Sequence, residues 1–448
     1  MKNAFFSVFL VFLCVSCATN ERAYWEMDNA VQISNFEKGV ELIDKAQKSK
    51  KLVYPPKNEI LLYLDRGLLE HYASMYRESA KDLGQAEKLI ENAATKSISE
   101  GAASYILNDN VKSYAGEDYE NIYINVFNAI NYYHMGNIDG ALVETRKINE
   151  KLRTLAGEYD KINREMRDEY KDSLSGIKLP ESKPVNFTNS ALADYLGALF
   201  YRADGAYDDA RINLLQLRSA FLTAPGVYYN PIPSSLVLSG EAGDETAEEL
   251  RRQDEKARVN LVCFTGLSPV KKEETIPFLL PYEYGLDYAQ LRLPVLTPRP
   301  DSITSIEMII DDDKPLKLEL LEDVGKAVAE TYKAKFNAVF LKTLVRSAVK
   351  YASVFVMADA AARGSDSEAV GTLTAFAAKA AFDATERADI RMERYLPAKA
   401  WIGAANMEPG EHTIRINYYS GSKRIESEEK IINTAAGRLN LLEGICLK

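Results

Sequence analysis

The sequence is poor in the residues on which most catalytic sites depend. Its 448 residues include three histidines (His71, His134 and His412), four cysteines and two tryptophans. Because the histidines are far apart in sequence, we do not expect a metal site with several histidine ligands. The chain also lacks a Gly-rich phosphate loop and the CxxC, HExxH and GxSxG motifs. Neither a catalytic metal nor a cofactor is therefore predicted.

A basic surface is absent as well. The formal net charge is −10, which argues against a nucleic-acid partner, and nothing indicates a small-molecule ligand. Hydrophobic residues make up 46% of the chain and charged residues 27%, a composition typical of folded proteins and not of disordered ones. At roughly 100–200 residues per domain, the length allows two to four domains.

The first residues have the pattern of a secretion signal. A short basic start precedes an apolar run over residues 4–15, which is shorter than the roughly 20 residues of a membrane-spanning helix. The run ends in Leu-Cys-Val-Ser-Cys and resembles a bacterial lipobox. The resemblance implies a signal peptide at 1–16, lipidation of Cys17 by acyl chains such as palmitate, and a lipidated tether at 17–23. An ordinary secretory signal and acylation at Cys14 are the alternatives.

The residue after Cys17 is Ala18, not Asp. The resemblance to sorted lipoproteins then implies a lipid-anchored protein of the bacterial cell envelope, at the outer membrane. Two further cysteines, Cys263 and Cys446, are far apart in sequence. We expect separate buried thiols there, with a disulfide as the alternative in an oxidising compartment.

Small residues recur at fixed offsets through residues 24–221. The three clearest copies start at Gly67, Ala129 and Ala198; small residues follow at +7 and +12, and an apolar residue follows at +19. Phe36 and Gly39 mark a fourth copy. These positions are typical of a helical hairpin, in which small residues let two helices cross closely and end the first helix. The offsets resemble the tetratricopeptide repeat (TPR), although the starts are 62 and 69 residues apart instead of about 34. We predict a TPR-like α-helical solenoid with inserted helices.

Solenoids of this kind bind peptides and proteins on their concave face. Aromatic residues of the helices are therefore candidates for partner binding, with packing inside the repeats as the favoured alternative. The candidates are Tyr72, Tyr132, Tyr133 and Tyr201.

The sequence changes character after residue 221. Residues 222–258 are predicted to be a linker, because frequent prolines as far as residue 300 exclude long helices except over the charged stretch 242–257. A buried strand is predicted at 259–264 and a hairpin at 302–310 and 316–321. The three aspartates of its turn, at 311–313, are read as a solvated loop and not as a cation site.

Residues 322–391 are predicted to form a long helical insertion, broken at 364–367. Its stretch 338–362 is Ala-rich, but Lys342, Arg346, Lys350 and Asp359 make it a packed hairpin and not a membrane span. Four strands are predicted to follow residue 397, and the strands on both sides of the insertion are expected to form one small β-sandwich-like domain at 259–448. The predicted fold class is therefore α+β.

Four sequence blocks resemble a family of uncharacterised TPR-like bacterial lipoproteins. They lie at 266–273, 321–324, 344–350 and 388–413, and Met392 departs from the pattern expected there. The resemblance implies an envelope location and this architecture, and it implies no particular activity.

Four charged residues are the best polar candidates in the C-terminal part: Glu322, Asp323, Asp389 and Arg391. We favour a role in bridging the helical arms to the β domain over a binding cluster. The predicted function is a non-catalytic scaffold or adaptor that binds an envelope protein or peptide through the repeat face. The alternative is an envelope enzyme, or an activator of a peptidoglycan-modifying enzyme, which a pocket with a carboxylate of shifted pKa would favour.

Overall fold

The computed structural model describes residues 18–48, 53–100, 112–169, 187, 189–240, 246–251, 255–282, 285–365 and 367–448. The expected signal peptide and the lipidated Cys17 lie outside the described residues. From residue 18 on, the expected tether is the first part of a helix. The fold is mixed α+β, as predicted.

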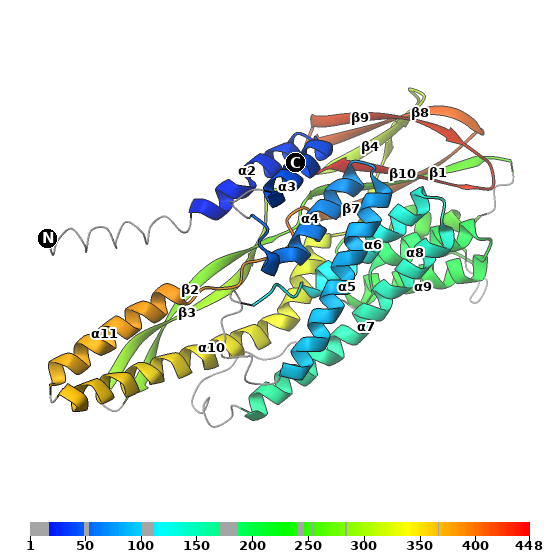
Figure 1. Ribbon diagram of the computed structural model, residues 1–448. Helices are drawn as coiled ribbons and strands as arrows, with labels where there is room; N and C mark the ends of the chain where they lie inside the picture. The colour runs from blue at the N-terminus through cyan, green and yellow to red at the C-terminus, as the bar shows by residue number, and fades with distance from the viewer. Residues whose placement is uncertain are drawn as a thin grey trace.

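The N-terminal half is built from helical hairpins that follow one another along the chain (Figure 1). The described helices are α2 (Ala18–Gln32), α3 (Phe36–Lys48), α4 (Glu59–Tyr72), α5 (Tyr76–Glu100), α6 (Asp118–His134), α7 (Ile138–Glu169), α8 (Ala191–Ala203) and α9 (Tyr207–Thr223). The pairs are α2–α3, α4–α5, α6–α7 and α8–α9.

The position of the turns between paired helices, which the offsets predicted, is confirmed. Each +7 position lies in the turn and has a positive φ: 61° at Ser74, 75° at Gly136 and 80° at Gly205. Gly67 lies where α4 and α5 cross, since a Cβ there would be 2.8 Å from the Leu83 side chain. The wide spacing of the copies is due in part to α5 and α7, which have 25 and 32 residues.

The C-terminal half contains two four-stranded sheets and a separate two-stranded ribbon. The first sheet has the order β10-β1-β7-β6 and the second has the order β5-β4-β8-β9; β2 and β3 form the ribbon. The strands are β1 (Ala257–Leu267), β2 (Val270–Tyr282), β3 (Gly285–Thr297), β4 (Ser305–Ile310), β5 (Leu316–Lys317), β6 (Glu319–Glu322), β7 (Pro397–Met407), β8 (Gly410–Ser420), β9 (Lys423–Thr434) and β10 (Leu439–Cys446).

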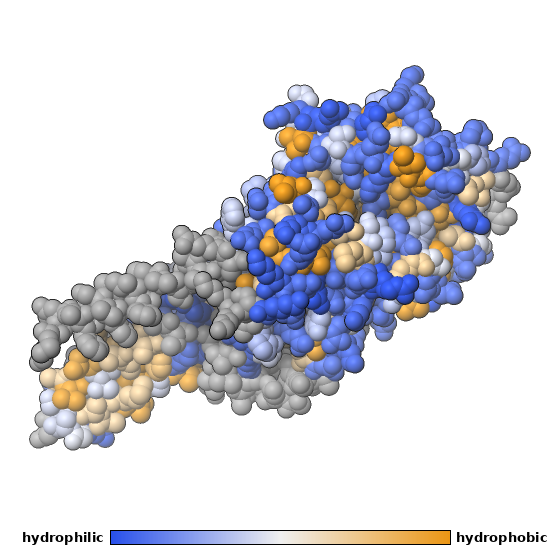
Figure 2. Space-filling model, turned by 45° about the horizontal axis from the view of Figure 1, so that its top comes forward, coloured by the Kyte–Doolittle hydropathy of each residue, from blue (hydrophilic) through white to orange (hydrophobic). Residues whose placement is uncertain are grey.

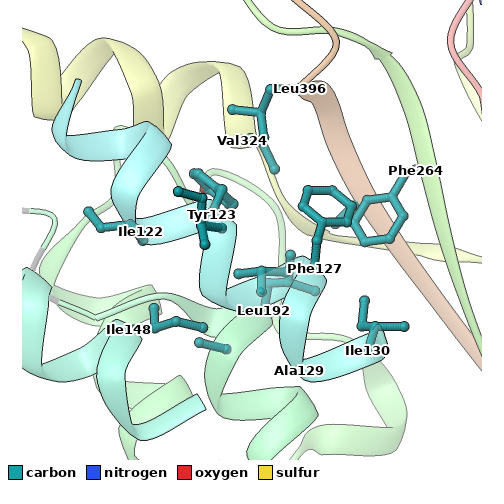
Figure 3. Close-up of a cluster of buried hydrophobic side chains, with 14 of the residues drawn as sticks. Ile122, Tyr123, Phe127, Ala129, Ile130, Ile148, Leu192, Phe264, Val324 and Leu396 are labelled. Atoms are coloured by element: carbon teal, nitrogen blue, oxygen red, sulfur yellow. The ribbon is translucent and has the colours of Figure 1, made fainter. Parts of the chain in front are cut away.

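Strand β1 is buried on both faces, which explains its continuous apolar sequence. Val259, Leu261 and Cys263 belong to the core between the two sheets. Val262 and Phe264, on the opposite face, belong to the core of the helical hairpins. Figure 3 shows Phe264 beside Phe127 of α6, and their ring centroids are 5.2 Å apart. One continuous core therefore joins the helices to the first sheet.

Helices α10 (Val324–Ser365) and α11 (Glu368–Thr385) lie between β6 and β7 in the chain, where the helical insertion was predicted. Together with β2 and β3 they form a projection, which we call the arm. It extends to the lower left of Figure 1, away from the two sheets.

Three details differ from the sequence-based expectation. Strands β2 and β3 were not predicted, because Pro277, Pro281 and Pro294 interrupt them; a two-stranded ribbon tolerates proline, since both of its strands are edges. The second strand of the predicted hairpin, at 316–321, is divided between two sheets. Its first part, β5, pairs with β4, whereas β6 pairs with β7 in the other sheet. No α-helix is present in the described residues of 242–257, which contain a short 3₁₀ turn at Glu248–Leu250 and the start of β1.

Candidate functional site

Two of the four candidate tyrosines contact the C-terminal half of the chain itself. The buried Tyr72 hydroxyl donates to the backbone oxygen of Tyr395 at 2.9 Å. The Tyr133 hydroxyl donates to the Leu439 oxygen and accepts from the Leu441 amide, both in β10. The first sheet and the segment before β7 thus occupy the helical surface on which these tyrosines lie.

The other two tyrosines pack among the helices. The ring of Tyr132 lies against Gly140 of the same hairpin, where an added Cβ would be 3.0 Å from the ring. The Tyr201 hydroxyl accepts a 2.8 Å hydrogen bond from Arg146 of the preceding hairpin. Both side chains are half-buried and connect helices.

Glu322 fastens the end of β6 to the start of α8. Its fully buried carboxylate accepts hydrogen bonds from the hydroxyls of Tyr123 and Tyr228, both at 2.7 Å. It also accepts from the side chain of Ser190 and the amide of Leu192, where the positive end of the α8 dipole lies. The Glu322 carboxylate is therefore a structural joint between the sheet and the helices.

Of the remaining charged candidates, Asp389 and Arg391 together form a joint of the same kind. Arg391 pairs with Asp389 at 2.8 Å and reaches Asn58 and the backbone oxygen of Lys112 in the helical half. Burial alone would raise the pKa of Asp389, but the hydrogen bonds and charge of Arg391 outweigh it and lower that pKa. Asp323 caps α10 by accepting from the Lys326 amide. The bridging role is thus the one that the geometry supports, although the bridge leads to the N-terminal helices.

A cluster of buried carboxyls, which the sequence did not reveal, lies where the segment before β7 crosses the helices. Burial raises the pKa of Asp65 to about 6, and burial with the nearby Glu117 charge raises that of Glu120 to about 7. The pKa of Glu393 is raised by burial and by the charges of Asp65 and Glu120. Asp65 accepts a hydrogen bond from the backbone amide of Arg394, and Glu120 accepts one from the amide of Glu393. These two carboxyls therefore hold the irregular segment before β7 in place.

The space beside these carboxyls is too small for a substrate. Glu120 and Glu393 line a cavity of about 10 Å³, whose other walls are Tyr123 and aliphatic side chains. That volume holds about one water molecule. In the described part of the chain, the space beside Glu120 and Glu393 is therefore limited to a cavity of that size.

Two histidines that are distant in sequence meet at one carboxylate. His71 and His134 both contact Glu443 of β10 at 2.8 Å. Burial would raise the pKa of Glu443, but the two histidines lower it well below its usual range. Strand β10 is thereby held against the ends of α4 and α6. No sequence signal could have linked these residues, since they meet only through the fold.

The direction of the hydrogen bonds around His71 can be assigned. Ser79 donates its only hydroxyl proton to the Gly67 oxygen, so it accepts from the amide nitrogen of Asn131. The Asn131 oxygen therefore faces Nδ1 of His71, at 2.7 Å, while Nε2 faces Glu443. Both ring nitrogens of His71 therefore face oxygen atoms of neighbouring side chains.

The turn aspartates Asp311 and Asp312 are paired with neighbouring side chains, and the two cysteines are buried. Asp311 accepts from His412 and from the Thr413 amide, and Asp312 pairs with Arg415. Cys263 and Cys446 are separate buried thiols, as expected. Among the described residues, no group of three or more His, Cys, Asp or Glu side chains is arranged to hold a metal ion.

Several large apolar side chains are exposed on the two helices of the arm. Phe376 and Leu373 of α11 are 73% and 68% exposed, and Val356 of α10 is 69% exposed. Val349, Met357 and Val370 are also exposed on these helices. Figure 2 shows the apolar residues gathered at the end of the arm. Such a concentration is typical of contact surfaces on folded proteins, whereas single exposed apolar residues need no explanation.

Neither the fold nor the sequence is placed in a family by comparison: no protein family, curated protein or solved structure matches the chain. In the described part of the chain, no helix combines the length and apolar character that crossing a membrane requires. The Ala-rich stretch of α10 is part of the arm.

Proposed function

We propose that the protein is a non-catalytic scaffold of the bacterial cell envelope that binds a protein partner through its arm. The observation that carries this proposal is the exposed apolar surface on α10 and α11. Burying side chains such as Phe376 and Leu373 in an interface contributes roughly 1.5–3 kcal/mol each. The arm also projects from the body, so a partner can reach it without disturbing the core (Figure 1).

The proposal moves the partner site away from the repeat face. That face supports binding less well, because Tyr72 and Tyr133 are already engaged by the C-terminal half. Tyr132 and Tyr201, which are half-buried, remain candidates for a secondary contact. We further propose that the four hairpins are TPR-like repeats, which the shared turn and crossing positions support.

A lipid on Cys17 would hold this scaffold at the membrane, where confinement raises the effective concentration of its partners. Labelled fatty acid should be incorporated by the wild-type chain and lost in Cys17→Ser. Retention of the label in that variant, with its loss in Cys14→Ser, would move the lipidation site.

The proposed binding surface is tested by placing charges on it. Leu373→Lys with Phe376→Lys should abolish recovery of the partner after reversible crosslinking in intact cells, because two charges would be buried in an apolar contact. Ile431→Lys on β9 is the matched control, since Ile431 is 70% exposed and distant in the fold. Equal recovery of the partner by the double variant and the control would contradict the proposal.

A further inference from the structure

Helix α2 has an exposed tryptophan on the side that faces away from the core. Tyr24, Met27 and Val31 are buried and define the inner side of the helix. At 100° per residue, Trp25 and Asn29 lie on the outer side, and Trp25 is 65% exposed. Tryptophan side chains are highly buried on average, so a ring exposed to this extent is unusual.

The outer side of α2 continues into the turn after the helix. The Ile33 amide donates to the Asn29 oxygen, so Ile33 still follows the helical path, and its side chain is 63% exposed. Over residues 24–33 this side is uncharged except for Glu26 at its edge. We call it the α2 face, and it consists of Trp25, Asn29, Gln32 and Ile33.

The chain enters α2 on this same side. The helix begins at Ala18, which directly follows Cys17 in the sequence. Ala18 is seven residues before Trp25, which is close to two turns, so the two positions lie about 20° apart around the helix axis. Along the axis they are about 10 Å apart. A lipid on Cys17 would therefore be attached next to the α2 face.

We infer that the α2 face lies on a lipid bilayer, with the Trp25 ring among the lipid headgroups. This inference rests on the proposed lipidation of Cys17, because that anchor brings the face to the membrane. The headgroup layer is roughly 5–8 Å thick on each side of the hydrocarbon core. An upright helix would carry Trp25 through this layer into water, whereas a helix that lies along the surface keeps the ring within it. Tryptophan is enriched at that level, since its ring is apolar and its N–H group needs an acceptor.

The size and the charge of the α2 face fit a lipid surface better than a protein. Four residues are far too few for a stable protein interface, which takes roughly 800 Å² per partner. On a membrane the acyl chains supply the affinity, so the face only has to orient the body. The net charge of −10 repels the rest of the body from anionic lipids, which confines the contact to an uncharged surface.

The two tryptophans of the chain make this contact measurable. The full-length lipidated protein is reconstituted into phosphatidylcholine vesicles with and without bromine atoms on the acyl chains, which quench nearby tryptophans. Brominated vesicles should lower the wild-type emission by up to about half, because Trp25 is one of the two tryptophans. The matched control is Trp25→Phe, whose emission comes from the buried Trp401 and should not change. Flotation of the vesicles, with Cys17→Ser as the control without lipid, shows whether the protein is anchored.

The other outcomes overturn the inference in distinguishable ways. Wild-type protein that floats with the vesicles but is quenched no more than Trp25→Phe would be anchored with its α2 face in water. That result would exclude the membrane contact and leave the proposed scaffold function standing. Wild-type protein that does not float would remove the anchor itself, and with it the proposed place of the scaffold at the membrane.

Discussion

Removing the Glu322 carboxylate should strongly destabilise the protein, because this one group joins the sheet to the helices. Its loss leaves the hydroxyls of Tyr123 and Tyr228 without their acceptor in a buried site. An orphaned buried donor costs about 1–3 kcal/mol. The Ser190 hydroxyl and the Leu192 amide lose the same acceptor, so this cost applies to several donors at once. We therefore expect Glu322→Ala to lower the free energy of unfolding by about 3–5 kcal/mol, a large part of the roughly 5–15 kcal/mol of a folded domain.

Two further variants test whether the loss of stability comes from the Glu322 carboxylate itself. One keeps the shape of the side chain, and the other is a control in the same strand. Glu322→Gln keeps one acceptor oxygen but turns an amide group toward the donors Ser190 and Leu192, so we expect a loss of about half that size, roughly 2 kcal/mol. Glu319→Ala, in the same strand, removes only exposed hydrogen bonds to Ser234, so it should lower the free energy of unfolding by no more than about 1 kcal/mol.

The assay is urea unfolding followed by far-ultraviolet circular dichroism and by tryptophan fluorescence, in which the buried Trp401 should change more than the exposed Trp25. Coincident transitions would justify free energies from a two-state analysis. A loss below about 1 kcal/mol for Glu322→Ala, or a loss equal to that of Glu319→Ala, would refute the view of Glu322 as the joint.

Three further predictions address other parts of the fold. The pKa values of Asp65 and Glu120 are raised in the folded state. Their contribution to the free energy of unfolding is therefore complete below about pH 4 and is lost as the pH rises through 6 to 7. The urea midpoint should therefore fall between pH 5 and pH 8, less so in Asp65→Asn, and a rising midpoint would contradict the burial argument. Ser74→Gly should stabilise the chain by about 1 kcal/mol, and Gly136→Ala should destabilise it similarly, because both residues have a positive φ; thermal unfolding that moves both the same way would exclude this reason. Gly371→Leu should push α11 off α10, which limited proteolysis would show as faster cutting in the arm than in wild type.

Local patterns explain why the helical hairpins were predictable. The positions of Ser74 and Gly136 follow from spacing within a single hairpin, where turn and crossing geometry depend on nearby residues only. The four C-terminal strands and the helical insertion were predicted on the same basis, from alternation and from their turns. Long-range pairing was not accessible in this way. Strand β6 belongs to the first sheet because it pairs with β7, and both helices of the arm lie between these two strands in the chain.

The functional surfaces were harder to foresee, for physical reasons. Tyr72 was a candidate for partner binding, with packing inside the repeats as the favoured alternative, but it is the C-terminal half that covers it. The pairing of His71 and His134 through Glu443 joins residues that no sequence pattern connects. In the arm, an Ala-rich sequence indicates packed helices, and only the position of Gly371 at the crossing shows which sides remain exposed.

The central claim, that the arm is the surface by which this protein binds, is tested most directly by a photocrosslinking scan in intact cells. A photoreactive residue is placed in turn at Val356, Leu373 and Phe376 on the arm, at Tyr132 and Tyr201 on the repeat helices, and at Ile431 as the control. The account predicts strong, specific adducts from the arm positions and only background from the others. Adducts that arise from Tyr132 and Tyr201, with none from the arm, would contradict it and return the partner site to the repeat face.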